Sequence, residues 1–195
     1  MKVGIVALQG AVSEHVEMVE RTLSEMGKSG RAVPVRRLED IKSVSALIIP
    51  GGESTTIGKA LVKSGLHDEI VMLAGKGMPV MGTCAGCVLL AKEGDDEVAR
   101  TGTKLLSLMD MAVDRNAFGS QRESFEADLD IGGIGNFHAV FIRAPLIRKA
   151  WGECRALAEV EEGIVMARQG SLLALSFHPE LACDTRLHRF FLEMV

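Results

Sequence analysis

Two cysteines three positions apart, Cys84 and Cys87, lie in the stretch PVMGTCAGCVLL at residues 79–90. Such a pair could be a redox couple, two metal ligands, or one nucleophile beside an unrelated thiol. A thioredoxin-type redox motif does not have glycines two residues before and after its first cysteine, and a metal site would need a second close pair of ligands. The sequence therefore favours a single nucleophile at Cys84, with Cys87 packed in the core.

The segment Gly82-Thr83-Cys84-Ala85-Gly86 has the form of a nucleophile elbow, with cysteine where hydrolases often have serine. The elbow is a sharp turn from a strand into a helix, and its glycines let neighbouring backbone approach closely. Unpaired N–H groups at the start of a helix favour an anionic sulfur, which is the attacking form of cysteine.

A nucleophilic thiol needs a base, and His178 is the best candidate. The run LLALSFHPEL at residues 172–181 ends an apolar strand with His-Pro-Glu. Pro179 biases His178 towards an extended conformation, and Glu180 could orient the imidazole and stabilise its charged form. The alternative is a histidine that merely ends a strand at a proline turn.

The run IIPGGESTT at residues 48–56 is the third segment of interest. A predicted strand ends in Pro-Gly-Gly, and Ser54 or Thr55 could cap the helix that follows. Adjacent glycines could aim N–H groups at an oxygen that gains negative charge, as in an oxyanion hole. The alternative is an ordinary glycine-rich turn, since the spacing of a phosphate-binding loop is absent.

These three segments follow short apolar runs that alternate with helical patterns. Strands are expected at residues 2–8, 31–38, 45–50 and 78–83, and helices at 10–27, 55–65 and 85–94. This alternation predicts an α/β fold with a parallel sheet between helices, and Pro34 favours an edge position for its strand. Strand-like runs from about 105 to 175 predict an antiparallel extension, and residues 184–195 form an amphipathic helix. His15 and His188 fall in the predicted helices, as packing or surface residues.

The length and composition limit the possible classes of protein. The 195 residues fit a single domain, and the net charge of −4 gives no sign of nucleic-acid binding. No apolar run approaches the ~20 residues needed to cross a bilayer, and the N-terminus does not have the pattern of a signal peptide. A cytoplasmic location is therefore expected. Four cysteines in a chain of this size do not predict a disulfide framework.

Together these segments resemble the class I glutamine amidotransferases, and most closely the branch that serves pyridoxal 5′-phosphate synthase. The matching stretches are GIVALQGAVSEH (4–15), IPGGESTTIGKAL (49–61), GTCAGCVLLA (82–91), DRNAFGSQRESFE (114–126), VFIRAP (140–145) and SFHPEL (176–181). The resemblance covers nearly the whole chain. It implies one glutaminase domain over residues 1–195, flavodoxin-like and three-layered, with a mostly parallel central sheet flanked by helices and an antiparallel extension.

The resemblance also implies a reaction, the hydrolysis of L-glutamine to glutamate and ammonia. Cys84 would attack the side-chain amide to form a thioester, and His178 would protonate the departing ammonia and then activate water. Glu180 would orient His178. The substrate contacts implied in the same way are Gly52, Glu53, Ser54, Arg115, Ile142 and Arg143, and the oxyanion donors are the Gly51–Gly52 peptide and the N–H of Ala85. No metal or cofactor is expected.

A partner is implied as well, because no part of the chain is left over to bind an ammonia acceptor. In the family the partner is a (β/α)8-barrel synthase that builds pyridoxal phosphate, and Gln9 matches the region that meets it. Gln9 is expected to help set the oxyanion donors only when the synthase is docked. Two other functions stay open at this point: a cysteine peptidase or γ-glutamyl hydrolase, and a non-catalytic binding subunit.

Overall fold

The computed structural model describes residues 1–115, 117 and 124–195 of the chain. In sequence order its strands are β1 (Lys2–Val6), β2 (Arg31–Val35), β3 (Ala46–Ile49), β4 (Val80–Thr83), β5 (Ala91–Gly94), β6 (Met109–Asp114), β7 (Ser124–Ile131), β8 (Gly135–Ile142), β9 (Leu146–Ala150), β10 (Arg155–Val160), β11 (Gly163–Gln169) and β12 (Leu172–Leu175). The helices are α1 (Val12–Glu25), α2 (Leu38–Ile41), α3 (Ser54–Ser64), α4 (Leu66–Gly75), α5 (Ala85–Leu90), α6 (Asp96–Thr101), the 3₁₀ turn η1 (Pro179–Leu181) and α7 (Arg186–Leu192).

Within these residues, one large sheet has the strand order β2-β1-β3-β4-β12-β11-β9-β6-β5, with β10 paired to β11. The first five strands of this order run parallel to one another. β2 lies at the edge of the sheet, as Pro34 predicted. Strands β1, β3, β4 and β12 have buried interiors, which explains why they appear as nearly continuous apolar runs in the sequence.

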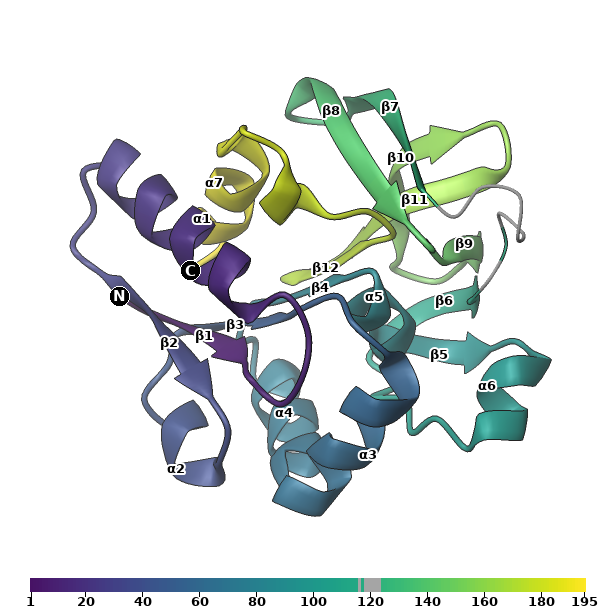
Figure 1. The fold of residues 1–195 in the computed structure, drawn as a ribbon, viewed down its shortest axis with the longest axis horizontal. Helices are drawn as coiled ribbons and strands as arrows, with labels where there is room; N and C mark the ends of the chain where they lie inside the picture. Colours follow the sequence, from purple (N-terminus) through teal and green to yellow (C-terminus); the bar gives the residue numbers. More distant parts are fainter. Residues whose placement is uncertain (116, 118–123) are drawn as a thin grey trace.

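Helices cover both faces of the parallel half of the sheet, which gives three layers (Figure 1). Helices α1 and α7 pack against each other on one face, and α2, α3 and α4 lie on the opposite face. Two separate clusters of buried apolar side chains fill the spaces between the layers. The predicted α/β, three-layer architecture is therefore confirmed.

The predicted antiparallel extension is also present. β11 pairs antiparallel with β10, β12 and β9, β6 pairs antiparallel with β9, and β7 and β8 form a separate antiparallel hairpin. β5 is an exception, because it pairs parallel with β6. Of the helices in the described residues, none is long and apolar enough to cross a membrane.

The predicted helix over residues 85–94 is wrong in its second half. Helix α5 ends at Leu90, and residues 91–94 form β5 instead. The backbone of β5 pairs with β6, and the ammonium of Lys92 forms an ion pair with Asp110 on that strand. Tertiary pairing thus overrides a local helical pattern, while α4 and α6 are helices that the sequence reading did not include.

Candidate active site

The segments with predicted chemistry meet at one edge of the sheet. β1, β3, β4 and β12 are parallel neighbours, so the loops that follow them leave from the same edge. Gln9 follows β1, Gly51 and Gly52 follow β3, Cys84 follows β4 and His178 follows β12. Open α/β sheets bind ligands at the carboxyl ends of their strands, and this site has that position.

Cys84 has the strained backbone that a nucleophile elbow requires. Its φ of 48° and ψ of −102° are unusual for a residue with a side chain. The N–H of Cys84 donates to the carbonyl of Leu175 on the neighbouring strand at 2.8 Å, which fixes the turn. The flanking glycines are needed for close approach: a Cβ on Gly86 would lie 2.1 Å from the carbonyl oxygen of Ile49, and one on Gly82 2.5 Å from the backbone of Gly86.

His178 lies between Cys84 and Glu180. Its Nδ1 is 2.7 Å from Oε1 of Glu180, and both side chains are buried. Burial opposes a charge on the imidazole, but hydrogen bonds to Cys84 and Glu180 outweigh it and raise the pKa of His178 to about 10. Burial also disfavours an ionised Glu180, yet the neighbouring His15 and His178 hold the pKa of this carboxyl below its usual value. The arrangement therefore favours an imidazolium beside the sulfur of Cys84.

Gly51 and Gly52 are pressed between this triad and the loop before α1. A Cβ on Gly51 would lie 2.5 Å from Cε1 of His178, and one on Gly52 2.5 Å from Oε1 of Gln9. The carbonyl of Gly51 accepts a hydrogen bond from the N–H of Ala11 at 3.2 Å. Because C=O and N–H of a trans peptide point in opposite directions, this bond also sets the direction of the Gly52 N–H.

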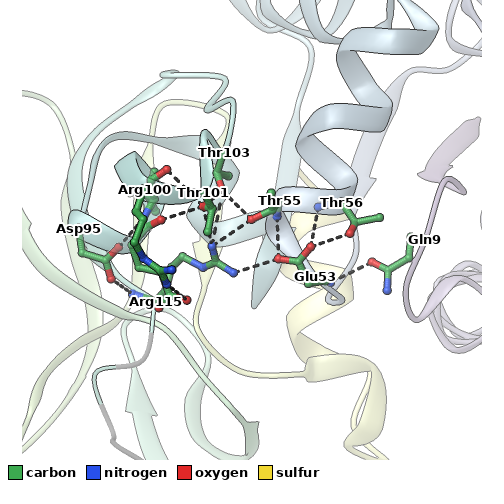
Figure 2. A network of polar contacts seen from close by, with 11 residues as sticks. Gln9, Glu53, Thr55, Thr56, Asp95, Arg100, Thr101, Thr103 and Arg115 are labelled. Carbon is green, nitrogen blue, oxygen red and sulfur yellow. Dashed lines mark hydrogen bonds and ion pairs between the residues drawn. The ribbon is translucent and has the colours of Figure 1, made fainter.

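Gln9 joins the same loop to the start of α3 (Figure 2). Its Oε1 accepts a hydrogen bond from the N–H of Glu53 at 2.9 Å. The loop before α1 therefore holds the Gly51–Glu53 segment at two points, through Ala11 on the carbonyl of Gly51 and through Gln9 on the N–H of Glu53. A movement of this loop would be transmitted directly to the candidate oxyanion donors.

Glu53 caps α3, so the predicted caps Ser54 and Thr55 are wrong by one or two positions. Glu53 has an extended backbone, and its carboxylate accepts hydrogen bonds from the N–H groups of Thr55 at 3.0 Å and Thr56 at 2.6 Å (Figure 2). Its longer side chain reaches the orphan donors that a serine would otherwise satisfy. Burial opposes the charge, but these hydrogen bonds outweigh it and lower the pKa of Glu53 to about 2.

Arg115 is paired with Glu53 rather than free. Its Nη2 donates to Oε1 of Glu53 at 2.9 Å, and its Nη1 donates to the hydroxyl of Thr55 at 3.1 Å and of Thr101 at 3.3 Å (Figure 2). The Arg115 N–H donates to Asp95 at 2.7 Å, which fixes the backbone. Glu53 and Arg115, both expected from the resemblance to contact the substrate, therefore satisfy each other in this structure.

A cavity of about 360 Å³ joins these elements. Every predicted site residue except Glu180 lines it, and Glu180 lies behind His178. The predicted residues among its lining are Gln9, Gly51, Gly52, Glu53, Ser54, Cys84, Ala85, Arg115, Ile142, Arg143 and His178. The carbonyl of Ile142 is 3.8 Å from the Sγ of Cys84. Of the motif at 114–126, residues 116 and 118–123 lie outside the described residues.

Cys87 is fully buried, as expected for a core residue. Burial, with a smaller contribution from the neighbouring Cys84 and against the opposing effect of Ser176, raises the pKa of the Cys87 thiol far above its ordinary value. Cys84 and Cys87 are both free thiols, with no disulfide between them in this structure. Cys154 is also buried, whereas Cys183 is exposed.

His15 is the residue near the site that sequence reasoning missed. It is fully buried on α1, and its Nε2 is 3.4 Å from Oε2 of Glu180. Its position was detectable, because His15 falls three residues after Val12 and four before Val19, and these spacings place all three on one apolar face of the predicted helix. A histidine on a buried stripe must find polar partners there.

The fold and the site together define a class I glutamine amidotransferase: a cysteine elbow after a central parallel strand, with a His-x-Glu segment after its neighbour. The model of the SNO glutamine amidotransferase family matches residues 5–195. The chain therefore belongs to the SNO glutamine amidotransferase family, and it is an enzyme of that class.

Individual relatives agree with this assignment over their full length. The chain is 52% identical over 194 residues to the pyridoxal 5′-phosphate synthase subunit PdxT of Archaeoglobus fulgidus, covering 100% of this chain and 98% of the relative. It is 54% identical over 195 residues to the protein of the same name from Pelotomaculum thermopropionicum, covering 99% and 94%. A solved structure described as a glutamine amidotransferase superposes with a TM-score of 0.88 at 46% identity, covering 98% and 97%.

Proposed function

We propose that this chain is the glutaminase subunit of a pyridoxal 5′-phosphate synthase, which hydrolyses L-glutamine and delivers the ammonia to a synthase subunit. The observation that carries this proposal is the placement of Cys84 and His178 on the lining of a cavity large enough for one amino acid, with Glu180 hydrogen-bonded to His178 from behind. The similarity to full-length PdxT subunits supports the same function. A peptidase would need an open groove for a longer chain.

The proposed reaction begins when the thiolate of Cys84 attacks the side-chain amide carbon of glutamine. The developing oxyanion is stabilised by the N–H of Gly52 and the N–H of Ala85, the first helical residue of α5. The imidazolium of His178 protonates the departing nitrogen, ammonia leaves, and a thioester remains. His178, now neutral, removes a proton from water as it attacks the thioester, and glutamate is released with the thiol restored.

Substrate binding is proposed for the wall opposite the nucleophile. Arg115 or Arg143 would bind the α-carboxylate of glutamine, and Glu53 would bind its α-ammonium. Gly52, Ser54 and Ile142 complete the lining. Because Glu53 and Arg115 are paired with each other, substrate binding would exchange one set of charge-assisted hydrogen bonds for another.

The proposed partner is a (β/α)8-barrel synthase that takes ammonia directly, since ammonia released into water is protonated and no longer nucleophilic. Gln9 is proposed to couple the partner to catalysis. The contacts of Gln9 and Ala11 with the Gly51–Glu53 segment support this proposal, because a protein docked on this loop would adjust the oxyanion donors. The expected cytoplasmic location and the single domain over residues 1–195 stay predictions.

The experiment that tests the proposed function measures glutamate release from L-glutamine by the purified chain, alone and with the synthase subunit. We expect rapid hydrolysis with the synthase and little without it. Cys84→Ala should abolish hydrolysis in both cases while the two subunits still associate. Rapid hydrolysis that does not depend on Cys84, or none with the synthase present, would overturn the proposal.

A control variant separates loss of the nucleophile from general damage. Cys183→Ala removes the exposed cysteine, which lies outside the cavity. This variant should hydrolyse glutamine at the rate of the unmodified chain. If Cys84→Ala and Cys183→Ala lost glutamine hydrolysis equally, the loss would come from an effect of cysteine removal that is unrelated to the triad.

A further inference from the structure

The carboxylate of Glu180 has a second histidine on its far side. Oε1 of Glu180 is bonded to His178, while Oε2 faces Nε2 of His15 at 3.4 Å. The side chains of Glu180 and His15 are both fully buried. Within the part of the chain that the structure describes, Oε2 has no hydrogen bond of standard geometry, so His15 is the polar group poised to satisfy it.

His15 is itself held by two side chains from other elements. Its Nε2 is 3.2 Å from the hydroxyl of Thr83, the residue before the nucleophile, and its Nδ1 is 3.3 Å from Nε2 of His188 on α7. Helices α1 and α7 pack against each other and α1 contacts η1, which contains Glu180 (Figure 1). His15 on α1 thus connects its own helix to β4, η1 and α7.

Burial keeps this second histidine neutral. It lowers the pKa of His15, against the opposing effect of Glu180, and it lowers the pKa of His188 well below its ordinary value. A neutral imidazole has one N–H donor and one bare nitrogen, so the position of its single proton decides what His15 can do.

The contacts assign that proton to Nε2. A bare Nε2 would place a lone pair against an ionised carboxylate oxygen, which is repulsive, whereas an N–H there donates to it. His188 points to the same tautomer: its Nδ1 has no hydrogen-bond partner among the described residues, and a buried bare nitrogen is tolerated better than a buried unpaired N–H. His188 therefore donates from Nε2 to Nδ1 of His15, and the Nε2–H of His15 is hydrogen-bonded to the hydroxyl of Thr83 with Oε2 of Glu180 beside it at 3.4 Å.

We propose that His15 is a positioning residue for the reaction, which fixes the carboxylate of Glu180 through its Nε2–H so that Oε1 stays on His178. The proposal deepens the proposed function and rests on it. Titratable groups surround the Glu180–His15 contact on both sides. His178 faces Glu180, and Cys84 lies beyond His178. His188 faces His15, and the charge of Glu14 is nearby. His15 touches neither the cavity nor the reacting atoms.

Removing the Nε2–H of His15 has a definite consequence for Glu180. Oε2 of Glu180, a buried anionic oxygen with no hydrogen bond of standard geometry among the described residues, would lose the N–H that lies beside it, so the carboxylate would be less stable and would rotate or take up a proton. Either change weakens the support for a charged His178. The thiolate–imidazolium pair would then form only at higher pH, and less of the enzyme would be in its reactive state at neutral pH.

The test compares His15→Met, which has similar volume and no donor, with His15→Gln, whose amide N–H can occupy the place of Nε2–H. The isolated full-length chain is alkylated with iodoacetamide between pH 5 and 9, and modification of Cys84 is followed by mass spectrometry of its peptide. Exposed Cys183 gives an internal reference. We expect the pH midpoint for Cys84 to rise by about one unit in His15→Met, as for loss of one hydrogen bond to a buried charge, and to return in His15→Gln.

Steady-state kinetics with the synthase subunit give an independent readout. His15→Met should lower kcat by about 10-fold or more and leave KM unchanged, because the contact acts on the triad and not on the substrate. His15→Gln should recover most of kcat. A matched control is Thr22→Val, which removes another fully buried hydrogen-bonding group from α1 without approaching Glu180. It should keep the original midpoint and kcat.

Three results would overturn the proposal. Folded His15→Met could keep the original kcat and the original pH midpoint of Cys84 alkylation, or His15→Gln could be as impaired as His15→Met. The third is a Thr22→Val variant whose alkylation profile shifts as much as that of His15→Met. Should His15→Met not fold, His15→Asn replaces it, because its shorter amide keeps a polar group near His188 but cannot reach Glu180. Failure of the proposed function gives a different result: no glutamate from the unmodified complex, while the alkylation profiles still report on His15.

Discussion

The two walls of the cavity differ in how far they are prepared for the reaction. On one side, Cys84 and His178 line the cavity and Glu180 lies behind His178; all three are almost completely buried, and Nδ1 of His178 is hydrogen-bonded to Glu180. On the other, Glu53 is 47% exposed in its side chain and is paired with Arg115. The catalytic wall is thus preorganised, whereas the binding wall satisfies its own charges until a substrate replaces them.

This difference shows which part of the site must rearrange when a substrate binds. The strained turn at Cys84 and the buried carboxylate are costly, and they persist because neighbouring strands hold them in place. The ion pair on the binding wall is partly exposed, so breaking it costs little once the α-amino and α-carboxylate groups of an amino acid provide new partners. Changes in the first wall should therefore affect kcat, and changes in the second should affect KM.

The largest effect is expected for Glu180→Gln. The neutral amide no longer stabilises the imidazolium and can hold His178 in the wrong tautomer, so kcat should fall by about 10³- to 10⁴-fold, as for the corresponding change in serine protease triads. KM should stay nearly unchanged. The measurement is glutamate release with the synthase subunit, with a thermal melt to verify folding; a folded variant within tenfold of normal kcat would contradict the preorganised wall.

A smaller effect, of a different kind, is expected for Arg115→Lys. Lysine keeps the charge but loses the planar fork, so the apparent KM for glutamine should rise by about 10-fold while kcat changes little. Arg148→Lys is the matched control, because Arg148 forms a comparable surface pair with Asp114 at 2.6 Å. A fall in kcat without any change in KM would show that Arg115 supports the chemistry rather than the substrate.

The smallest effect concerns the dependence of stability on pH. His188 is fully buried, and burial holds its pKa well below 6.5, so the unfolded chain takes up this proton more readily than the folded one. Its contribution to stability is present above pH 6.5 and is lost as the pH falls below that value. His188→Met should therefore reduce the loss of unfolding free energy between pH 6.5 and 5 by about 1–2 kcal/mol, measured by chemical denaturation.

A surface histidine supplies the control for this prediction. His138 is exposed beside Asp128 and Glu126, whose hydrogen bonds raise its pKa. A raised pKa gives a stabilisation that is fully present below pH 6.5 and is lost as the pH rises through the higher pKa of the folded state, which is the opposite sign to His188. His138→Gln should therefore leave the acid-induced loss unchanged or slightly larger; a reduction equal to that of His188→Met would contradict the assignment.

Much of this site could be predicted from the sequence because its signals are local. The glycines around Cys84 are required by close backbone approach, Pro34 marks an edge strand, and His-Pro-Glu at the end of β12 sets the position of His178. Parallel strand order then brings loops together from distant parts of the chain, so eleven residues named in advance line one cavity.

The strand at residues 91–94, the cap of α3 and the place of His15 depended on long-range contacts that no local pattern encodes. Residues 91–94 became a strand because β6 offers an edge to pair with, and Glu53 became the helix cap because its carboxylate also meets Arg115. His15 fits an apolar stripe as well as any packing residue would, and only the fold places it against Glu180. Long-range pairing, in each case, decided between two locally acceptable structures.

The central claim is that Cys84 alone acts as the nucleophile, activated by His178. The most direct measurement is peptide-resolved mass spectrometry after the chain, together with its synthase subunit, reacts with a diazo-ketone analogue of glutamine. We predict one label per chain, on Cys84, blocked by excess glutamine and strongly slowed in His178→Asn. Label on Cys87, on exposed Cys183, or on Cys84 at an undiminished rate in that variant would contradict the account.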